Sequence, residues 1–194
     1  MIMETAVAIK SPTIKLNKAI LRKLIEAYKA KRMQKWTNLP GGYTVWKIPA
    51  PRGLGTYFAL ITFERSAIGY VLVNKMLLQS KPKVRGWMIV QSYLLPDVRG
   101  VGIMNRVYNL ILTTGRLIAS PVMTQAAMRF WVNRIQTDVH HFYAVYDTQN
   151  SFVHVDPRSM GLMKNSIWDG SAKTILLCMN KDDPAIRKLN LLDR

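Results

Sequence analysis

The sequence is poor in cysteine and has no long apolar run. A single cysteine among 194 residues, Cys178, excludes an internal disulfide and any cluster of cysteine metal ligands. It lies in the apolar segment 174–179, where we expect a buried structural thiol. No apolar stretch reaches the roughly 18 residues that a membrane span requires, and residues 1–10 lack the apolar core of a secretory signal. The sequence therefore favours a cytoplasmic protein without a membrane span.

Acidic residues are also few. Asp and Glu total 11 against 28 Lys and Arg, so the formal net charge is +17. This excess favours a polyanionic partner such as DNA, RNA or a nucleic-acid complex, with an anionic membrane surface or a phosphorylated ligand as other choices. The plainer alternative is that positive charge keeps the protein in solution. Hydrophobic residues make up 49% and charged residues 20%, a balance typical of one packed domain over residues 1–194.

Hydrophobic periodicity predicts a mixture of helices and strands. Residues 15–35 are expected to form an amphipathic helix whose basic face either is solvated or contacts an anion. Apolar runs with turn signals between them predict strands at 43–48, 57–63, 68–76, 85–94, 117–119, 141–146 and 174–179. Helices are expected at 102–114 and from about 120 to 135, with a polar tail at the end of a C-terminal segment, 172–194. This order predicts an α+β fold with a mixed, mostly antiparallel sheet flanked by helices.

The strongest local signal is the sequence LLPDVRGVGIM at residues 94–104. A strand ends here, glycines permit a tight turn, and a helix begins whose first N–H groups have no intrahelical partner. Such N–H groups, together with the positive end of the helix dipole, form a cradle for a pyrophosphate. Arg99 and Arg106 add positive charge. The sequence therefore predicts a central strand–glycine turn–helix unit that binds an anion.

This segment resembles the signature of the GCN5-related N-acetyltransferases, in which Arg or Gln is followed by two variable residues, Gly, one residue, and Gly or Ala. Arg99, Gly102 and Met104 occupy these three places, and Pro96 matches a proline common upstream. The segment SPVMTQAAMRFW, residues 120–131, resembles the next element of the family, a strand leading into a helix. The resemblance covers about residues 57–146. Some phage-encoded members of the family depart from this signature in the way that this chain does at Gln91, Met104 and Trp131.

The resemblance implies acetyl-CoA as the cofactor and acetyl transfer to an amine as the activity. It places the pantetheine on the backbone of Tyr93, Leu94 and Leu95. It places the pyrophosphate on the segment Arg99, Gly100, Val101, Gly102, Ile103, Met104 and Asn105.

The sequence departs from the family pattern at three positions. Met104 replaces a small residue, Trp131 replaces the tyrosine that often acts as general acid, and Gln91 lies where many members have a carboxylate base. Substitute catalysts are therefore sought near the strand at 141–146, where the histidines of the chain gather. Tyr143 and Tyr146 are candidate acids, and His141, another histidine or Asp147 is the candidate base. The alternative is that these side chains pack in the sheet or lie at the surface.

Three functions are consistent with these observations. The first is an acetyl-CoA-dependent N-acyltransferase whose acceptor amine lies on or near a nucleic acid or a basic protein. The second is a catalytically inactive protein of the same fold that binds nucleic acid or inhibits a host protein. The third is an ordinary acetyltransferase that happens to be basic. No metal site is predicted, since His140 and His141 are adjacent and project in different directions.

Overall fold

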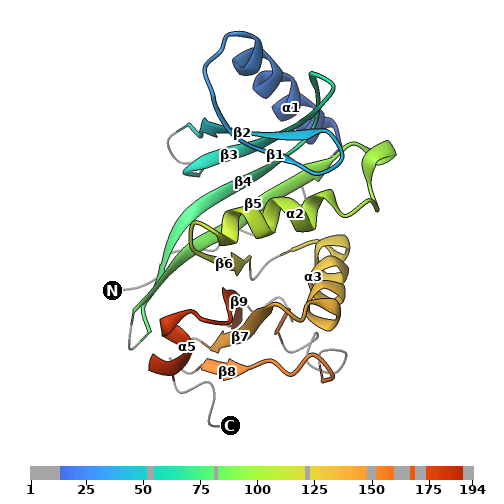
Figure 1. Ribbon diagram of the computed structural model, residues 1–194. Coiled ribbons are helices and arrows are strands. Elements are labelled where there is room, and N and C mark those ends of the chain that lie inside the picture. The colour runs from blue at the N-terminus through green and yellow to red at the C-terminus, as the bar shows by residue number, and fades with distance from the viewer. Residues whose placement is uncertain are drawn as a thin grey trace. The chain divides into compact units, whose positions relative to one another are not determined.

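The computed structural model describes residues 14–51, 55–80, 83–120, 123–147, 152–159, 167–168 and 174–189 (Figure 1). The chain falls into two compact units. The amino-terminal unit comprises Pro12–Met76 and Trp87–Thr114, and the carboxy-terminal unit includes Leu77–Gly86 and Gly115–Arg194. That these form a single domain over residues 1–194 stays a prediction.

The described residues contain nine strands in one sheet, hydrogen-bonded in the order β1-β2-β3-β4-β5-β6-β9-β7-β8. The strands are β1 (Gln34–Leu39), β2 (Tyr43–Pro49), β3 (Tyr57–Phe63), β4 (Ser66–Leu78), β5 (Val84–Leu94), β6 (Arg116–Ala119), β7 (His141–Asp147), β8 (Phe152–His154) and β9 (Thr174–Asn180). The β1–β2, β2–β3, β3–β4, β6–β9, β7–β8 and β7–β9 pairs are antiparallel. The predicted α+β class, with a mostly antiparallel sheet and flanking helices, is confirmed.

In the amino-terminal unit, helix α1 (Ile14–Lys29) covers one face of the sheet. Its buried residues Leu21 and Leu24 pack with alternate residues of the strands, and the whole cluster comprises Leu21, Leu24, Ile48, Phe58, Leu60, Tyr70, Leu72 and Tyr93. Because side chains alternate between the faces of a strand, neighbours of these residues such as Lys47 and Tyr57 lie on the face opposite α1.

The predicted helix over 15–35 is too long. Helix α1 ends at Lys29, and Lys31 has a positive φ of 54°, which stops helical propagation. Two backbone bonds close the helix: Lys31 N–H donates to Tyr28 O, and Arg32 N–H donates to Ala27 O, each at 3.0 Å. The last two residues of the predicted helix, Gln34 and Lys35, instead begin β1, an edge strand that pairs with β2.

The predicted strand–turn–helix unit is confirmed, and the predicted strands at 57–63 and 68–76 pair as an antiparallel hairpin. Strands β3 and β4 are joined by Glu64 and Arg65, which both have positive φ, as a tight two-residue turn requires. Strand β5 leads through the 3-10 turn η1 (Pro96–Val98) into helix α2 (Ile103–Leu112). Figure 1 shows α2 crossing in front of β5.

The carboxy-terminal unit contains β9 between β6 and β7, helix α3 (Gln125–Thr137) and the short helix α5 (Pro184–Lys188). Helix α5 lies in the predicted polar tail. It begins because the Asp183 carboxylate accepts the N–H of Ala185 at 2.8 Å and Pro184 occupies the first turn. Asp183 also receives two 2.7 Å hydrogen bonds from Arg116 of β6. This bidentate pair joins α5 to the sheet.

Helix α3 begins later than the sequence predicts. The Thr124 hydroxyl accepts the N–H of Ala127 at 3.2 Å and caps a helix that starts at Gln125. Residues 123–124 are not helical, and residues 121–122 lie outside the described part of the chain.

Candidate functional site

The glycine turn before α2 leaves open space at the start of the helix. Gly100 and Gly102 have φ of 84° and 77°, conformations that L side chains rarely adopt. A Cβ added to either glycine would meet no atom within 4 Å. Gly102 is the N-cap of α2 and has no side chain to accept the first N–H groups. The turn therefore presents the positive end of α2 to an open space, which is the arrangement that binds phosphate groups.

Two arginines flank this turn. The Arg99 Nε donates to the Leu94 carbonyl at 3.1 Å, and its guanidinium lies 5.9 Å from the centre of the Tyr93 ring. An Arg106 Nη1 donates to the Pro40 carbonyl at 2.6 Å, which fixes this side chain against the β1–β2 turn. Within the described residues, neither guanidinium has a carboxylate within 4 Å. Among the residues that the structure describes, both positive charges thus lack a neutralising ion pair.

The end of β5 is in close contact with β4. A Cβ at Gly69 would lie 2.4 Å from the Tyr93 carbonyl oxygen, so the two backbones approach as only glycine permits. Leu95 N–H donates to the Ile68 carbonyl at 2.8 Å. The Leu95 N–H and the Leu94 carbonyl, both predicted to contact pantetheine, therefore already have protein partners. The Tyr93 side chain is buried in the α1 core.

The other predicted cofactor contacts line the start of α2. Val101 is 55% exposed, whereas the Ile103 side chain is buried, so Ile103 can offer only its backbone to a ligand. Met104 and Asn105 are half-buried in the first turn of the helix. Whether Met104 contacts a cofactor stays a prediction.

Gln91 is bound within a polar network that joins β5 to α1. Its Nε2 donates to Asn17 Oδ1 at 2.5 Å and to the Tyr70 hydroxyl at 2.6 Å. The Tyr70 hydroxyl in turn donates to Asn17 at 3.1 Å. An amide held by two protein acceptors has no basic atom for proton abstraction, so Gln91 serves the packing of the helix on the sheet.

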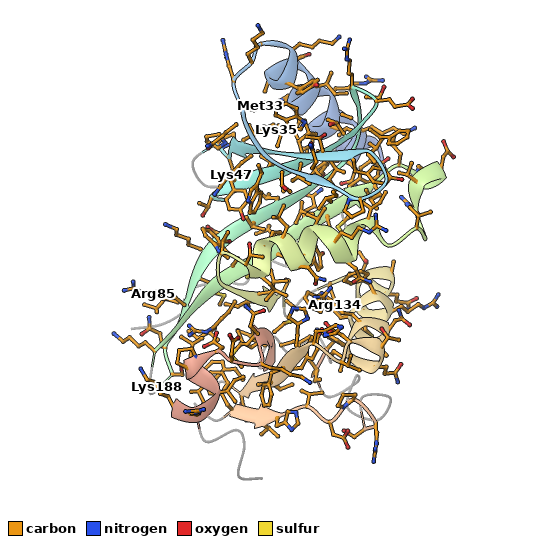
Figure 2. The ribbon with its side chains drawn as sticks, viewed as in Figure 1. Met33, Lys35, Lys47, Arg85, Arg134 and Lys188 are labelled. Carbon is orange, nitrogen blue, oxygen red and sulfur yellow. The ribbon has the colours of Figure 1, made fainter. Side chains whose placement is uncertain are left out.

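In the carboxy-terminal unit, two of the predicted catalytic residues converge on a carboxylate that sequence reasoning missed. The Asp138 Oδ2 lies 2.7 Å from His141 Nδ1 and accepts the Tyr143 hydroxyl at 2.6 Å. Its Oδ1 accepts the His140 N–H at 2.9 Å. Arg134, 3% exposed, places Nη2 3.6 Å from Oδ2 (Figure 2). An Asp three residues before a histidine was the available sequence signal.

The electrostatics of this cluster keep Asp138 ionised. Burial alone would raise the pKa of its carboxyl, but hydrogen bonds from Tyr143, the His140 N–H and His141 outweigh burial and lower it to about 2. An ionised carboxylate can only accept, so His141 donates from Nδ1, and in the neutral imidazole the lone pair then lies on Nε2. Burial raises the pKa of Tyr143 far above its ordinary value. Its hydroxyl is therefore a fixed donor to Asp138.

This depressed pKa predicts a loss of stability in acid. The folded-state pKa of Asp138 is about 2, against 3.8 for an unperturbed aspartate side chain. Its contribution to the free energy of unfolding, about 2 kcal/mol, is therefore complete above pH 3.8 and is lost as the pH falls through 2. Urea unfolding at several pH values would measure this. Asp138→Asn should have a shallower loss of stability between these pH values than the unmodified protein, and parallel curves would contradict the account.

Tyr146 does not join this cluster. Along β7, His141 and Tyr143 share one face, whereas Tyr146 lies on the other because it is an odd number of residues away. Its ring packs 4.8 Å from that of Phe152, and burial raises its pKa. His154 lies on this second face, stacked on Phe142 at 4.4 Å. The predicted catalytic set is thus divided by the sheet.

Two further residues singled out in the sequence lie in the core of the same unit. Cys178 is fully buried, as predicted, and burial raises the pKa of its thiol to about 12. Trp131 is 2% exposed on α3. Neither can act on a ligand from solvent in this arrangement. Among the described residues there is no group of three or more His, Cys, Asp or Glu placed to hold a metal ion, and no helix is long and apolar enough to cross a membrane.

No family model matches the chain, and no curated protein matches it. Among solved structures, the chain is similar to Arabidopsis thaliana Naa50 in complex with the bisubstrate analogue CoA-Ac-MVNAL. The sequences are 11% identical, the similarity covers 62% of this chain and 70% of that chain, and the TM-score is 0.32. A similarity this distant gives no information on the activity of this chain.

Proposed function

We propose that the protein is an acetyl-CoA-dependent N-acyltransferase. The observation that carries this proposal is the turn at Gly100 and Gly102, where two positive-φ glycines, an uncapped helix start and open space coincide. Arg99 and Arg106 supply positive charge beside it. This combination fits the pyrophosphate of coenzyme A, because backbone N–H groups and guanidinium groups both bind phosphate oxygens.

Two sets of residues would hold the two ends of the cofactor. The first-turn N–H groups of α2 and Arg99 would hold the pyrophosphate, and the carbonyl edge of Tyr93 and Leu94 would hold the pantetheine. Arg99 is bound to the Leu94 carbonyl in this structure. We infer that this guanidinium turns from the carbonyl to the phosphates on binding, which also frees the carbonyl for the pantetheine amides.

Bound acetyl-CoA supplies an activated thioester, whose carbonyl carbon forms a bond to the amine nitrogen as its bond to sulfur breaks. The protein must bind the amine uncharged, accept the proton that the nitrogen loses, and return one to the departing sulfur. Gln91 offers no base for this purpose.

His141 is our candidate proton acceptor, as the sequence predicts. Its Nδ1 lies 2.7 Å from the Asp138 carboxylate, which orients the ring so that in the neutral imidazole Nε2 carries the lone pair. Tyr143 donates to the same carboxylate oxygen and acts as a positioning residue that fixes Asp138. Tyr146, the other acid predicted from the sequence, lies on the opposite face of β7, so we assign it no role beside His141. The net charge of +17 supports an acceptor amine on or near a nucleic acid, and a basic protein is the other acceptor that we propose.

Release of coenzyme A thiol in the presence of candidate acceptors tests the activity and the role of His141. Aminoacylated RNA and basic peptides are the first acceptors to try. We expect thiol release with acceptor acetylation, and His141→Asn should lower kcat by about 100-fold or more, the usual size of a general-base contribution. His154→Asn, a histidine on the other face of the same sheet, should have little effect. An equal loss of kcat in the two variants would show that His141 is not the proton acceptor.

A second function is favoured by Gln91 and Trp131. The family's base position holds an amide in a closed network, and its acid position holds a core tryptophan. These observations support a catalytically inactive protein that binds nucleic acid or a host protein. Acetyl-CoA binding without thiol release, for every acceptor tried, would favour this second function over the first.

A further inference from the structure

A basic, aromatic groove lies in the amino-terminal unit, away from the glycine turn. It is a cavity of about 500 Å³ formed by the end of the α1–β1 connection and by strands β2 to β5. Its cations are Arg32, Lys47 and Lys75, and its aromatic walls are Tyr57 and Trp87. Figure 2 labels Met33 and Lys47, which also line it. We call this cavity the basic groove.

The aromatic rings of the basic groove form a continuous series on the sheet face opposite α1. The Tyr57 ring lies 5.6 Å from Trp36 and 5.3 Å from Trp87, both in edge-on packing. Lys47 Nζ lies 4.3 Å from the centre of Tyr57 and 5.2 Å from that of Trp36. Lys75 Nζ lies 5.7 Å from the Trp87 ring. The rings thus hold the lysine side chains at the groove.

In the part of the chain that the structure describes, no acidic side chain neutralises the charge of the basic groove. The acidic residues of the amino-terminal unit are Glu26, Glu64 and Asp97. None of them lines the groove, and among the described residues no salt bridge involves its three cations. Several like charges that converge on a concave, partly apolar surface raise the local concentration of an anion. The groove therefore fits a ligand that joins negative charge to flat apolar groups.

We propose that the basic groove binds single-stranded nucleic acid, with phosphates on Arg32, Lys47 and Lys75 and a base against the half-buried Trp36 or Trp87. Single strands meet both requirements, because every base has a face for stacking and every linkage a phosphate. The cavity has room for about one or two nucleotides and none for the width of a duplex.

A polymer is favoured over a free nucleotide by the charge outside the groove. Exposed Lys29, Lys31 and Lys35 lie on either side of the groove-lining segment 32–34 in the chain. A free nucleotide in the groove would not contact these three lysines, whereas a strand that continues past the groove can contact them. This binding site is independent of acetyl transfer and would exist in an active or inactive enzyme.

Fluorescence anisotropy with a labelled oligothymidylate of about 20 nucleotides, in about 0.1 M salt, tests the proposal. The variant is Lys47→Gln with Lys75→Gln. The matched control is Lys18→Gln with Lys23→Gln, which removes the same charge from exposed positions of α1 on the other sheet face. Thermal melting of both variants checks that each is folded.

We expect the groove variant to bind at least about tenfold more weakly than the unmodified protein, and the control to lose less than about threefold. The slope of log affinity against log salt should fall by about 1.4 in the groove variant, since each phosphate contact on a single strand contributes about 0.7. Absence of binding by the unmodified protein would overturn the proposal. Equal weakening in both variants would do so as well, because it would mean diffuse charge without a site.

Photocrosslinking locates the strand independently of any variant. An oligonucleotide with 5-iodouracil should crosslink to peptides that contain Trp36 or Trp87, since this base reacts with aromatic rings on which it stacks. A duplex of the same length should compete poorly, and free thymidine monophosphate should compete only at far higher concentration. Crosslinks confined to other segments, or equal competition by duplex or by the free nucleotide, would contradict the assignment.

Discussion

Arg99→Glu should abolish acetyl-CoA binding, raising the Kd by at least about 100-fold, which corresponds to about 2.7 kcal/mol. The substitution removes a guanidinium beside the turn at Gly100 and Gly102 and puts a carboxylate in its place. A charge-assisted hydrogen bond to phosphate is lost and a repulsion is gained. Because Arg99 is exposed and has no ion-pair partner among the described residues, the fold should tolerate the change.

The matched control is Arg22→Glu, the same charge reversal at an exposed position of α1 in the same unit. It should alter the Kd by less than about threefold, since surface charges several side chains away are largely screened. Calorimetric titration of both variants makes the comparison. If the two variants bind acetyl-CoA alike, the turn is not the pyrophosphate site.

Asp138→Ala should lower the free energy of unfolding by about 3 kcal/mol. The carboxylate accepts from the Tyr143 hydroxyl and the His140 N–H and contacts His141 Nδ1, and it lies 3.6 Å from buried Arg134. Its removal leaves a buried phenol without this acceptor and a buried guanidinium without this carboxylate. Truncating one partner of such a cluster costs more than the net value of the interaction.

Urea unfolding at neutral pH, monitored by circular dichroism, measures this loss. Asp182→Ala is the control, because Asp182 is an exposed acid in the same unit and its loss should change stability by less than about 0.5 kcal/mol. Asp138→Asn keeps the shape of the side chain, so its loss in free energy of unfolding should lie between those of Asp138→Ala and Asp182→Ala. A loss below about 1 kcal/mol in Asp138→Ala would show that the cluster does not anchor β7 to α3.

Much of the fold follows from apolar patterning in the sequence. The predicted strands at 57–63 and 141–146 agree with β3 and β7 to within a residue, because both are dense runs of β-branched and aromatic residues. Strand β1 was missed because QKWTNL is polar and mostly exposed at a sheet edge, so it has no alternating pattern. The basic residues before it continued the helical pattern, and the positive φ of Lys31 has no signature in sequence.

The candidate site was only partly predictable. Glycines mark the turn before α2 because only they adopt its positive φ without strain. Asp138 was missed because it follows a helix in a segment typical of a loop, and its importance comes from contacts with β7 and α3. The separation of Tyr146 from His141 follows from strand alternation and could have been predicted from their spacing. The basic groove is lined by residues of several strands, and these residues come together only because the strands pair in the sheet.

The most direct test of the central claim is calorimetric titration of the unmodified protein with acetyl-CoA and with acetyl-pantetheine, which has the same thioester but lacks the pyrophosphate. If the turn at Gly100 and Gly102 holds the pyrophosphate, acetyl-CoA will bind in the micromolar range and acetyl-pantetheine at least about 100-fold more weakly. No heat of binding at millimolar acetyl-CoA, or equal affinity for the two thioesters, would contradict the proposed cofactor site.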